Sequence, residues 1–257
     1  MTYLPPVDRL LKLGAEPARR RTWPDYRTLG LEDRHVPALI RMATDPALHA
    51  AEERDPAGWA PVHAWRALAQ LGAPAAAEPL LKLLSERMES DWVYDEVPLV
   101  LGLIGPSALH AATLLLFDEG GEDPLRIAAA GVITRVGLEH PDRADEAGAV
   151  LAKQLEDWRH QSRWLNANLI AGLAQLGGTE AAPLMEAAFA AGSVDLDVYG
   201  DWEDVQIDLG LLTERTTPPP GFAGPGARGA VTPRSSAKAR QRRKAEKAAR
   251  KRNRKKK

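Results

Sequence analysis

Six carboxylates gather within fourteen residues of the C-terminal third of the sequence, and carboxylate oxygens are the ligands that Ca²⁺ and Mg²⁺ prefer. They are Asp195, Asp197, Asp201, Glu203, Asp204 and Asp208. The stretch lacks the D-x-D-x-D-G spacing of a calcium loop, and Val198, Tyr199 and Trp202 interrupt the acids. The pattern therefore favours a structural role, and we expect no metal site here.

The order of residues around Asp201 indicates what that structural role is. Aspartate is a preferred N-cap residue, and acidic side chains stabilise the first turn of a helix. We therefore expect Asp201 to cap a short helix whose first turn contains Glu203 and Asp204. Trp202 and Val205 are expected to pack against the helix that precedes it.

No other set of residues has the spacing of a catalytic centre. The six histidines, at positions 35, 49, 63, 110, 140 and 160, include no pair at the i, i+4 spacing of a helical zinc site. The sequence has no cysteine, no G-x-S-x-G elbow and no P-loop. We expect no catalytic residue, no cofactor and no enzymatic activity.

The last twenty residues, 238–257, carry a high positive charge. They hold thirteen of the 34 basic residues and one of the 35 acidic ones, which leaves a net charge of −13 on the rest of the chain and +12 on this tail. Such a footprint is typical of phosphate binding. The residues expected to contact nucleic acid are Lys238, Arg240, Arg242, Arg243, Lys244, Lys247, Arg250, Lys251, Arg252 and Arg254.

The tail contains no aromatic residue, so stacking on bases and reading of sequence are not expected. RNA, the ribosome or DNA would then be bound non-specifically. Two other interpretations remain open, because a lysine-rich end can promote solubility or contact protein, including the acidic part of its own chain.

Four apolar segments share one pattern, and glycines 72, 105, 137 and 177 close them. Counting back from each glycine, apolar residues recur at positions −1, −4 and −8, which lie on one face of a helix. Position −1 is Leu71, Ile104, Val136 and Leu176; position −4 is Leu68, Leu101, Ile133 and Leu173; position −8 is Ala64, Val97, Ala129 and Leu169. Each glycine is expected to end its helix in a left-handed cap.

A second amphipathic stretch follows each glycine, with Leu84, Phe117 and Phe189 at position +12 in three of the four units. The glycines are 33, 32 and 40 residues apart, a period typical of helical hairpins that stack into an α-solenoid. Strand-like alternation is nearly absent. We therefore expect an all-α fold, an α-solenoid of stacked hairpins, in preference to an irregular helical bundle.

Composition divides the chain into four parts. We expect an N-terminal segment at 1–30, a repeat domain at 31–214, a Pro/Gly-rich linker at 215–234 and the Lys/Arg-rich tail at 235–257. The linker is expected to be disordered, because half of residues 216–233 are proline or glycine. A partial hairpin near residues 23–45 is expected to cap the first repeat.

Seven tryptophans stand out beside three phenylalanines. They are Trp23, Trp59, Trp65, Trp92, Trp158, Trp164 and Trp202. An aromatic strip on a binding surface is one interpretation, since tryptophan is enriched among interface anchors. The other, which we favour, is that these side chains fill gaps between stacked repeats.

The repeat pattern over residues 31–192 resembles the HEAT and HEAT-like repeats of bacterial proteins. The stretch from 181 to 211 looks like the end of a small bacterial HEAT-like family of unassigned function, on the match of Val194, Asp195, Gly200, Asp201, Trp202, Glu203, Asp204 and Val205. The resemblance implies a fold and a binding role. HEAT-like repeats also occur in bilin lyases and in a class of DNA glycosylases, so the fold does not settle the function.

Taken together, these patterns predict a non-enzymatic scaffold or adaptor. Its helical surface would bind a protein partner, which should be basic because the body is acidic, and its tail would contact nucleic acid. The alternative is a glycosylase-like enzyme acting on nucleic acid, which would need a basic concave face. No apolar run approaches a membrane span and no signal peptide is evident, so we expect a cytoplasmic protein with no membrane partner.

Overall fold

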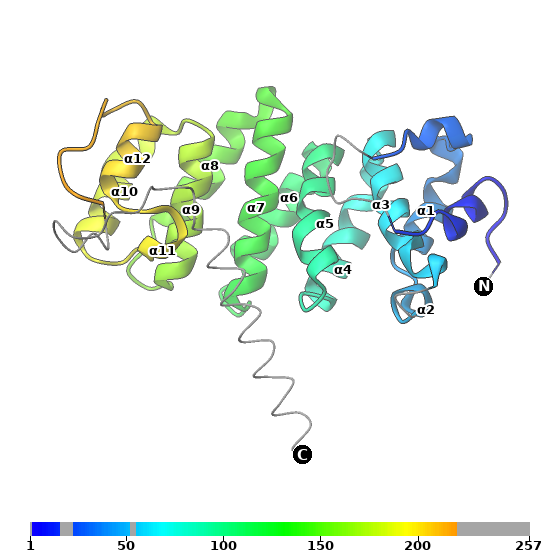
Figure 1. The fold of residues 1–257 in the computed structure, drawn as a ribbon. Coiled ribbons are helices and arrows are strands. Elements are labelled where there is room, and N and C mark those ends of the chain that lie inside the picture. Colours follow the sequence, from blue (N-terminus) through cyan, green and yellow to red (C-terminus); the bar gives the residue numbers. More distant parts are fainter. Residues whose placement is uncertain (1, 16–22, 52–54, 220–257) are drawn as a thin grey trace, which may run out of the picture. The chain divides into compact units, whose positions relative to one another are not determined.

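The described part of the chain is entirely helical. A computed structural model describes residues 2–15, 23–51 and 55–219, and within these ranges it contains α-helices and short 3₁₀ helices but no strand (Figure 1). The all-α expectation is confirmed. No helix in the described ranges is long and apolar enough to cross a membrane.

Twelve α-helices follow one another along the described chain. They are α1 (Val36–Ala43), α2 (Pro46–His49), α3 (Ala60–Leu71), α4 (Ala77–Glu86), α5 (Asp91–Ile104), α6 (Pro106–Leu116), α7 (Asp123–Glu139), α8 (Ala144–Leu155), α9 (Arg163–Gln175), α10 (Ala182–Ala190), α11 (Leu196–Tyr199) and α12 (Trp202–Asp208). The 3₁₀ helices are η1 (Val7–Lys12), η3 (Tyr26–Leu29), η4 (Asp33–His35), η5 (Pro56–Trp59), η6 (Pro74–Ala76), η7 (Pro141–Arg143) and η8 (Thr179–Ala181).

These elements form two compact units. The first unit ends at Gln154 and the second begins at Leu155, at the end of α8. The division falls inside the 31–214 region that the sequence treats as one repeat domain.

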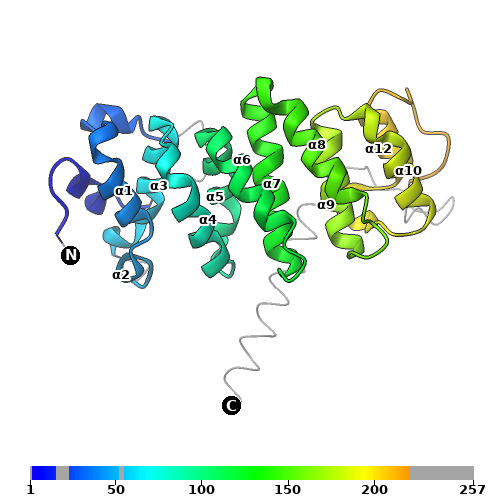
Figure 2. The same cartoon turned by 180° about the vertical axis from the view of Figure 1, so that it is seen from behind.

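In the first unit, the helices before the repeat glycines pack in chain order. α1 contacts α3, α3 contacts α5, and α5 contacts α7. Figure 1 shows these four helices side by side, and Figure 2 shows the same order from behind. The helices that follow Gly72 and Gly105 are also neighbours, because α4 contacts α6. Leu68, Leu101 and Ile133, all at position −4, are fully buried between them.

Three of the four repeat glycines lie at a helix end with a positive φ. The φ angle is 62° at Gly72, 94° at Gly105 and 71° at Gly177, a range that side chains rarely adopt. The predicted left-handed cap is wrong at Gly105, because its ψ of −141° lies outside the left-handed helical region. The prediction for Gly137 is wrong, because this residue lies inside α7, which runs on to Glu139. The helix ends instead where His140 precedes Pro141, since a residue before proline avoids the helical conformation.

Glycine also permits a close approach between α5 and α7. A Cβ atom on Gly102 would lie 2.5 Å from Cβ of Arg135, a separation that atoms do not adopt without a shift of the backbone. At the end of the same helix, a Cβ on Gly105 would lie 2.6 Å from Nε2 of His140. That imidazole donates from Nε2 to the Gly102 carbonyl at 3.1 Å, which joins the two helices.

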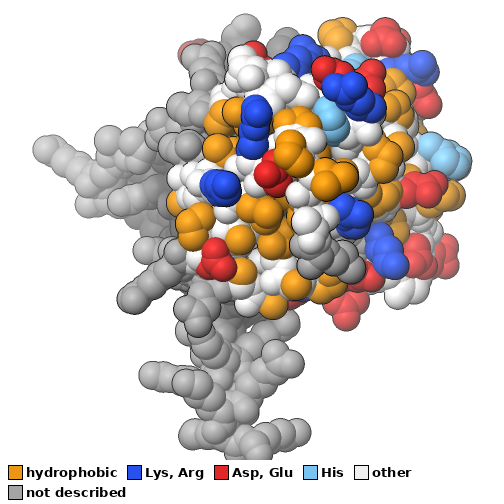
Figure 3. All heavy atoms as spheres, turned by 90° about the vertical axis from the view of Figure 1, so that its right-hand side faces the viewer, with side chains coloured by type: hydrophobic (Ala, Val, Ile, Leu, Met, Phe, Trp, Pro, Cys, Tyr) orange, Lys and Arg blue, Asp and Glu red, His pale blue; other side chains and the backbone are white. Residues whose placement is uncertain are grey.

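The N-terminal segment is bound to α3 by a buried chain of hydrogen bonds. Nε2 of His63 donates to the carbonyl of Gly14 at 2.8 Å, so Nδ1 accepts from the Tyr26 hydroxyl at 2.7 Å. Tyr3 donates its hydroxyl to Asp45 at 2.8 Å. Figure 3 shows this end of the first unit, where many hydrophobic side chains are interspersed with charged ones.

In the second unit, α9 packs against α11 and α12, and α12 packs against α10. Leu169 and Leu173 of α9 are fully buried, as the repeat pattern predicts. The buried amide of Asn166 donates to the carbonyls of Trp158 and Ser193 at 2.9 and 2.8 Å. These bonds join the loop before α9 to the loop between α10 and α11.

Candidate functional site

Among the described residues of the second unit, a set of interacting charged side chains lies at the start of α12. Asp201 is the N-cap, and its Oδ1 accepts from the backbone N–H of Asp204 at 3.1 Å. Oδ2 of Asp204 accepts in turn from the N–H of Asp201 at 3.1 Å, which completes a capping box. The prediction that Asp201 caps a short helix with Glu203 and Asp204 in its first turn is confirmed.

The hydrophobic side of α12 also follows the sequence pattern. Val205 is fully buried. The ring of Trp202 lies 5.9 Å from that of Phe189 in α10, measured between centroids. The short helix is thus held against α10 while its acidic end remains available to another segment.

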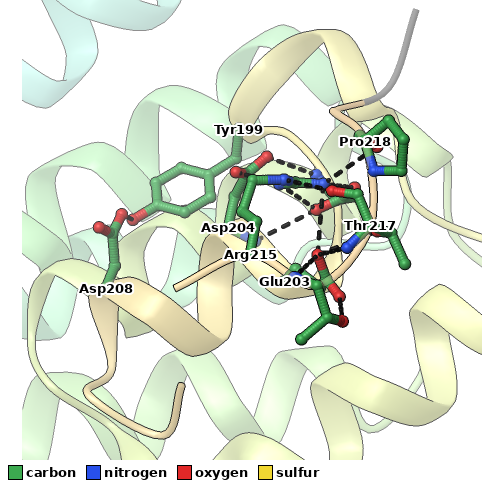
Figure 4. A network of polar contacts seen from close by, with 9 residues as sticks. Tyr199, Glu203, Asp204, Asp208, Arg215, Thr217 and Pro218 are labelled. Carbon is green, nitrogen blue, oxygen red and sulfur yellow. Dashed lines mark hydrogen bonds and ion pairs between the residues drawn. The ribbon is translucent and has the colours of Figure 1, made fainter. Parts of the chain in front are cut away.

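That segment is Arg215–Pro218, which we name the strap. Arg215 forms a bidentate ion pair with Asp201, from Nη1 to Oδ1 at 2.9 Å and from Nη2 to Oδ2 at 2.5 Å. Nη1 of Arg215 also bonds Asp204. Figure 4 shows Arg215 beside Asp204, with Pro218 on its other side.

The two threonines of the strap bind a single carboxylate. Glu203 accepts from the backbone N–H groups of Thr216 and Thr217 at 3.2 and 3.0 Å. The hydroxyl of Thr217 donates to Oε2 of Glu203 at 2.9 Å, and that of Thr216 donates to Oε1. Because four donors converge on it, Glu203 is the main polar anchor of the strap after the Arg215 ion pair.

The strap keeps these acids ionised. The hydrogen bond from Arg215 holds the pKa of Asp201 below its ordinary value, although burial alone would raise it. The hydrogen bonds from Thr216 and Thr217 hold the pKa of Glu203 below its ordinary value in the same way. Beside them, burial and the bond to Asp208 at 2.5 Å raise the pKa of Tyr199.

The carboxylates at the start of α12 are therefore satisfied by the capping box and by the strap. Among the described residues, no group of three or more His, Cys, Asp or Glu side chains is arranged to hold a metal ion. The strap itself was missed by sequence reasoning, which assigned it to the linker that begins at 215. The available signal was an arginine with two adjacent hydroxyls following an acidic stretch.

A second polar cluster lies in the core of the first unit. Arg66 of α3 is fully buried and pairs with Glu96 of α5, with Nη2 of the arginine 2.8 Å from Oε1 of the glutamate. Nε1 of Trp65 donates to Oε2 of Glu96 at 2.9 Å. These contacts join the first helices of two successive hairpins.

Tryptophans surround that ion pair. The guanidinium of Arg66 lies 5.2 Å from the ring of Trp23 and 6.0 Å from that of Trp92, within the range of cation–π attraction. Trp59 contacts Trp92 edge-on at 4.9 Å. Trp65 is buried, whereas Trp23, Trp59 and Trp92 are half-buried and reach the surface above the pair.

The described contacts of five histidines are with local backbone, a phenol or a carboxylate. The partners are the Glu32 N–H for His35, the Ala43 carbonyl for His49, Tyr26 and Gly14 for His63, the Gly102 carbonyl for His140 and Asp157 for His160.

The predicted nucleic-acid-binding residues, from Lys238 to Arg254, lie outside the described residues.

Comparison with protein-family models, with curated proteins and with solved structures finds no match to this chain.

Proposed function

We propose that this protein is a non-enzymatic scaffold of stacked HEAT-like hairpins that anchors a tail for contact with nucleic acid. The repeat part of this proposal is supported by the order of helix contacts in the first unit, where α1, α3, α5 and α7 pack in succession. Stacked hairpins share a continuous core and leave extended surfaces for binding.

The observation that carries the proposal is the strap. The chain runs to the tail, with its charge of +12, from one point on the described part of the protein, at the strap. Arg215 and its neighbours bind that point to α12 through charged hydrogen bonds. The tail residues from Lys238 onwards are thus attached to a defined site on the second unit.

The proposed nucleic-acid contact is electrostatic. Lysine and arginine that meet phosphates release condensed counterions, so the affinity depends on salt and hardly on sequence. Residues 1–237 carry a net charge of −13, which repels phosphate. We propose that its protein partner is basic for the same reason.

The test compares the full chain with a chain ending at Pro219, which keeps the strap but removes the tail. Binding to single-stranded RNA and to duplex DNA is measured at two or more salt concentrations. With about six phosphate contacts, the slope of log affinity against log salt on single strands should be about −4 to −5. The shortened chain should not bind.

A matched control keeps the length of the tail and lowers its charge from +12 to +2. It replaces the ten predicted contact residues, from Lys238 to Arg254, by glutamine. This variant should lose binding like the shortened chain. Equal binding by all three proteins, or no binding by the full chain at low salt, would show that the tail does not contact nucleic acid.

A further inference from the structure

The strap contains two threonine hydroxyls that donate hydrogen bonds to one carboxylate. Esterification of such a hydroxyl with phosphate replaces the donor by acceptors. The side chains of Thr216 and Thr217 are exposed to solvent, yet both hydroxyls donate to Glu203. Oε2 of Glu203 accepts from the Thr217 hydroxyl and from both threonine N–H groups. The side chain of Glu203 is only 16% exposed, so little water is available to replace these donors.

We propose that Thr217 is a phosphorylation site and that its phosphorylation releases the strap from α12. The donor is a nucleoside triphosphate bound to a protein kinase. A bond forms between Oγ1 of Thr217 and the γ-phosphorus, and the bond from that phosphorus to the nucleoside diphosphate breaks. The hydroxyl proton passes to a base of the kinase.

Repulsion would drive the release. A phosphate ester carries about −1.5 to −2 charges at neutral pH and offers acceptors only. The Thr217 oxygen that would carry it lies 2.9 Å from the Glu203 carboxylate, to which it now donates. Asp201 and Asp204 stand on the same helix end, so the phosphate meets three carboxylates.

Arg215 would then change partners. It is the cation that holds Asp201 and Asp204, and a phosphate two residues along the chain is a stronger acceptor for its planar donors. Movement of Arg215 onto the phosphate breaks its bidentate contact with Asp201. The ion pair and the Glu203 hydrogen bonds are therefore lost together.

The test uses full-length protein carrying phosphothreonine at 217, introduced by ligation. Hydrogen exchange of the Thr216 and Thr217 N–H groups reports on the strap, and that of Leu176, bonded to the Gly172 carbonyl at the end of α9, is the internal control. We expect exchange of the strap amides to accelerate at least tenfold, with Leu176 unchanged. Thr217→Val removes the hydroxyl without adding charge and should accelerate exchange less.

A neutral acceptor separates electrostatics from simple loss of a hydrogen bond. Glu203→Gln in the phosphorylated protein removes the charge opposite the phosphate and keeps an oxygen that accepts from the Thr216 and Thr217 N–H groups, so it should slow their exchange. The proposal is overturned if the phosphorylated chain retains the protection of the unmodified one, or if Thr217→Val matches phosphorylation. It is also overturned if protein isolated from its native cells lacks phosphate on the peptide that begins at Thr216. None of these readouts depends on nucleic-acid binding.

Discussion

At the residue scale, carboxylates have two structural roles in this protein. Glu96 neutralises a guanidinium inside the core of the first unit, while Asp201 and Glu203 bind a polar segment at the surface of the second. The first arrangement is costly to break, because a buried charge without a partner is destabilising. The second is sensitive to pH, since these carboxylates lose their charge when they are protonated.

The strap should detach in acid. The folded-state pKa values of Asp201 and Glu203 lie below the ordinary values of about 3.9 and 4.3. At a pH above the ordinary pKa values, the contacts of these two carboxylates stabilise the strap fully. This stabilisation is lost as the pH falls through the lowered pKa values of the folded state. Hydrogen exchange of the Thr216 N–H, measured from pH 6 to pH 2, should lose its protection below about pH 4. The Leu176 amide at the end of α9 is the reference. Equal protection of Thr216 at pH 2 and pH 6 would contradict this sign.

Replacing one partner of the buried ion pair between Arg66 and Glu96 should lower the stability strongly, and a second substitution should restore part of it. Arg66→Met leaves Glu96 charged and unpaired in the core, so the free energy of unfolding should fall by about 3–5 kcal/mol. Adding Glu96→Gln removes that charge and still offers an oxygen to Nε1 of Trp65. Urea denaturation of both variants should show the double variant to be the more stable. If it is less stable, the stranded charge is not the cause.

At the element scale, the contact between α5 and α7 depends on one missing side chain. Gly102→Ala should lower the free energy of unfolding by about 1–3 kcal/mol, because the added methyl meets Cβ of Arg135 and the helices must separate. Gly131 is the matched control, since it lies inside α7 with no atom within 4 Å of an added Cβ.

Gly131→Ala should stabilise the protein by about 0.5–1 kcal/mol, through the lower helix propensity of glycine alone. Thermal or urea unfolding of the two variants decides the matter. Similar effects of the two substitutions would mean that the close approach at Gly102 does not constrain the packing of α5 on α7.

The apolar periodicity correctly predicted the buried face of the helix that precedes each repeat glycine. It failed for part of the helix that follows the glycine. Positions −4 and −8 are buried in all four units, including Leu101 and Leu173. Position +12 is buried at Leu84 but 40% exposed at Phe117. The reason is a change of register: α6 begins directly after Gly105, whereas the turn η6 separates Gly72 from α4. Such a turn leaves no mark in the apolar pattern.

At the scale of the whole molecule, the strap was hidden from sequence reasoning for a related reason. Arg215–Pro218 buries no apolar side chain, and it stands at the start of a Pro/Gly-rich stretch. Its contacts reach back 11 to 14 residues to side chains already used as a helix cap. A pattern of apolar spacing cannot detect such polar docking, whereas the cap itself was predictable from Asp201 and its neighbours.

The position of a truncation should therefore matter. A chain ending at Pro219 keeps every strap contact, and its α12 amides should exchange as slowly as in the full protein. A chain ending at Thr213 removes Arg215 and leaves Asp201, Glu203 and Asp204 without its charge, so the Val205 amide should exchange faster. Hydrogen exchange on the two chains tests this directly. Equal rates would mean that the strap does not support α12.

Anchoring the strap also sets an upper limit on how far the tail can carry a ligand. Nineteen residue steps along the chain separate Pro219 from Lys238, a span of at most about 65 Å at about 3.4 Å per residue. One molecule confined to a sphere of that radius is at an effective concentration of about 1 mM. Under the proposed function, a nucleic acid bound at Lys238 would meet the carboxylates of the second unit at that concentration, and their repulsion would oppose binding to the tail.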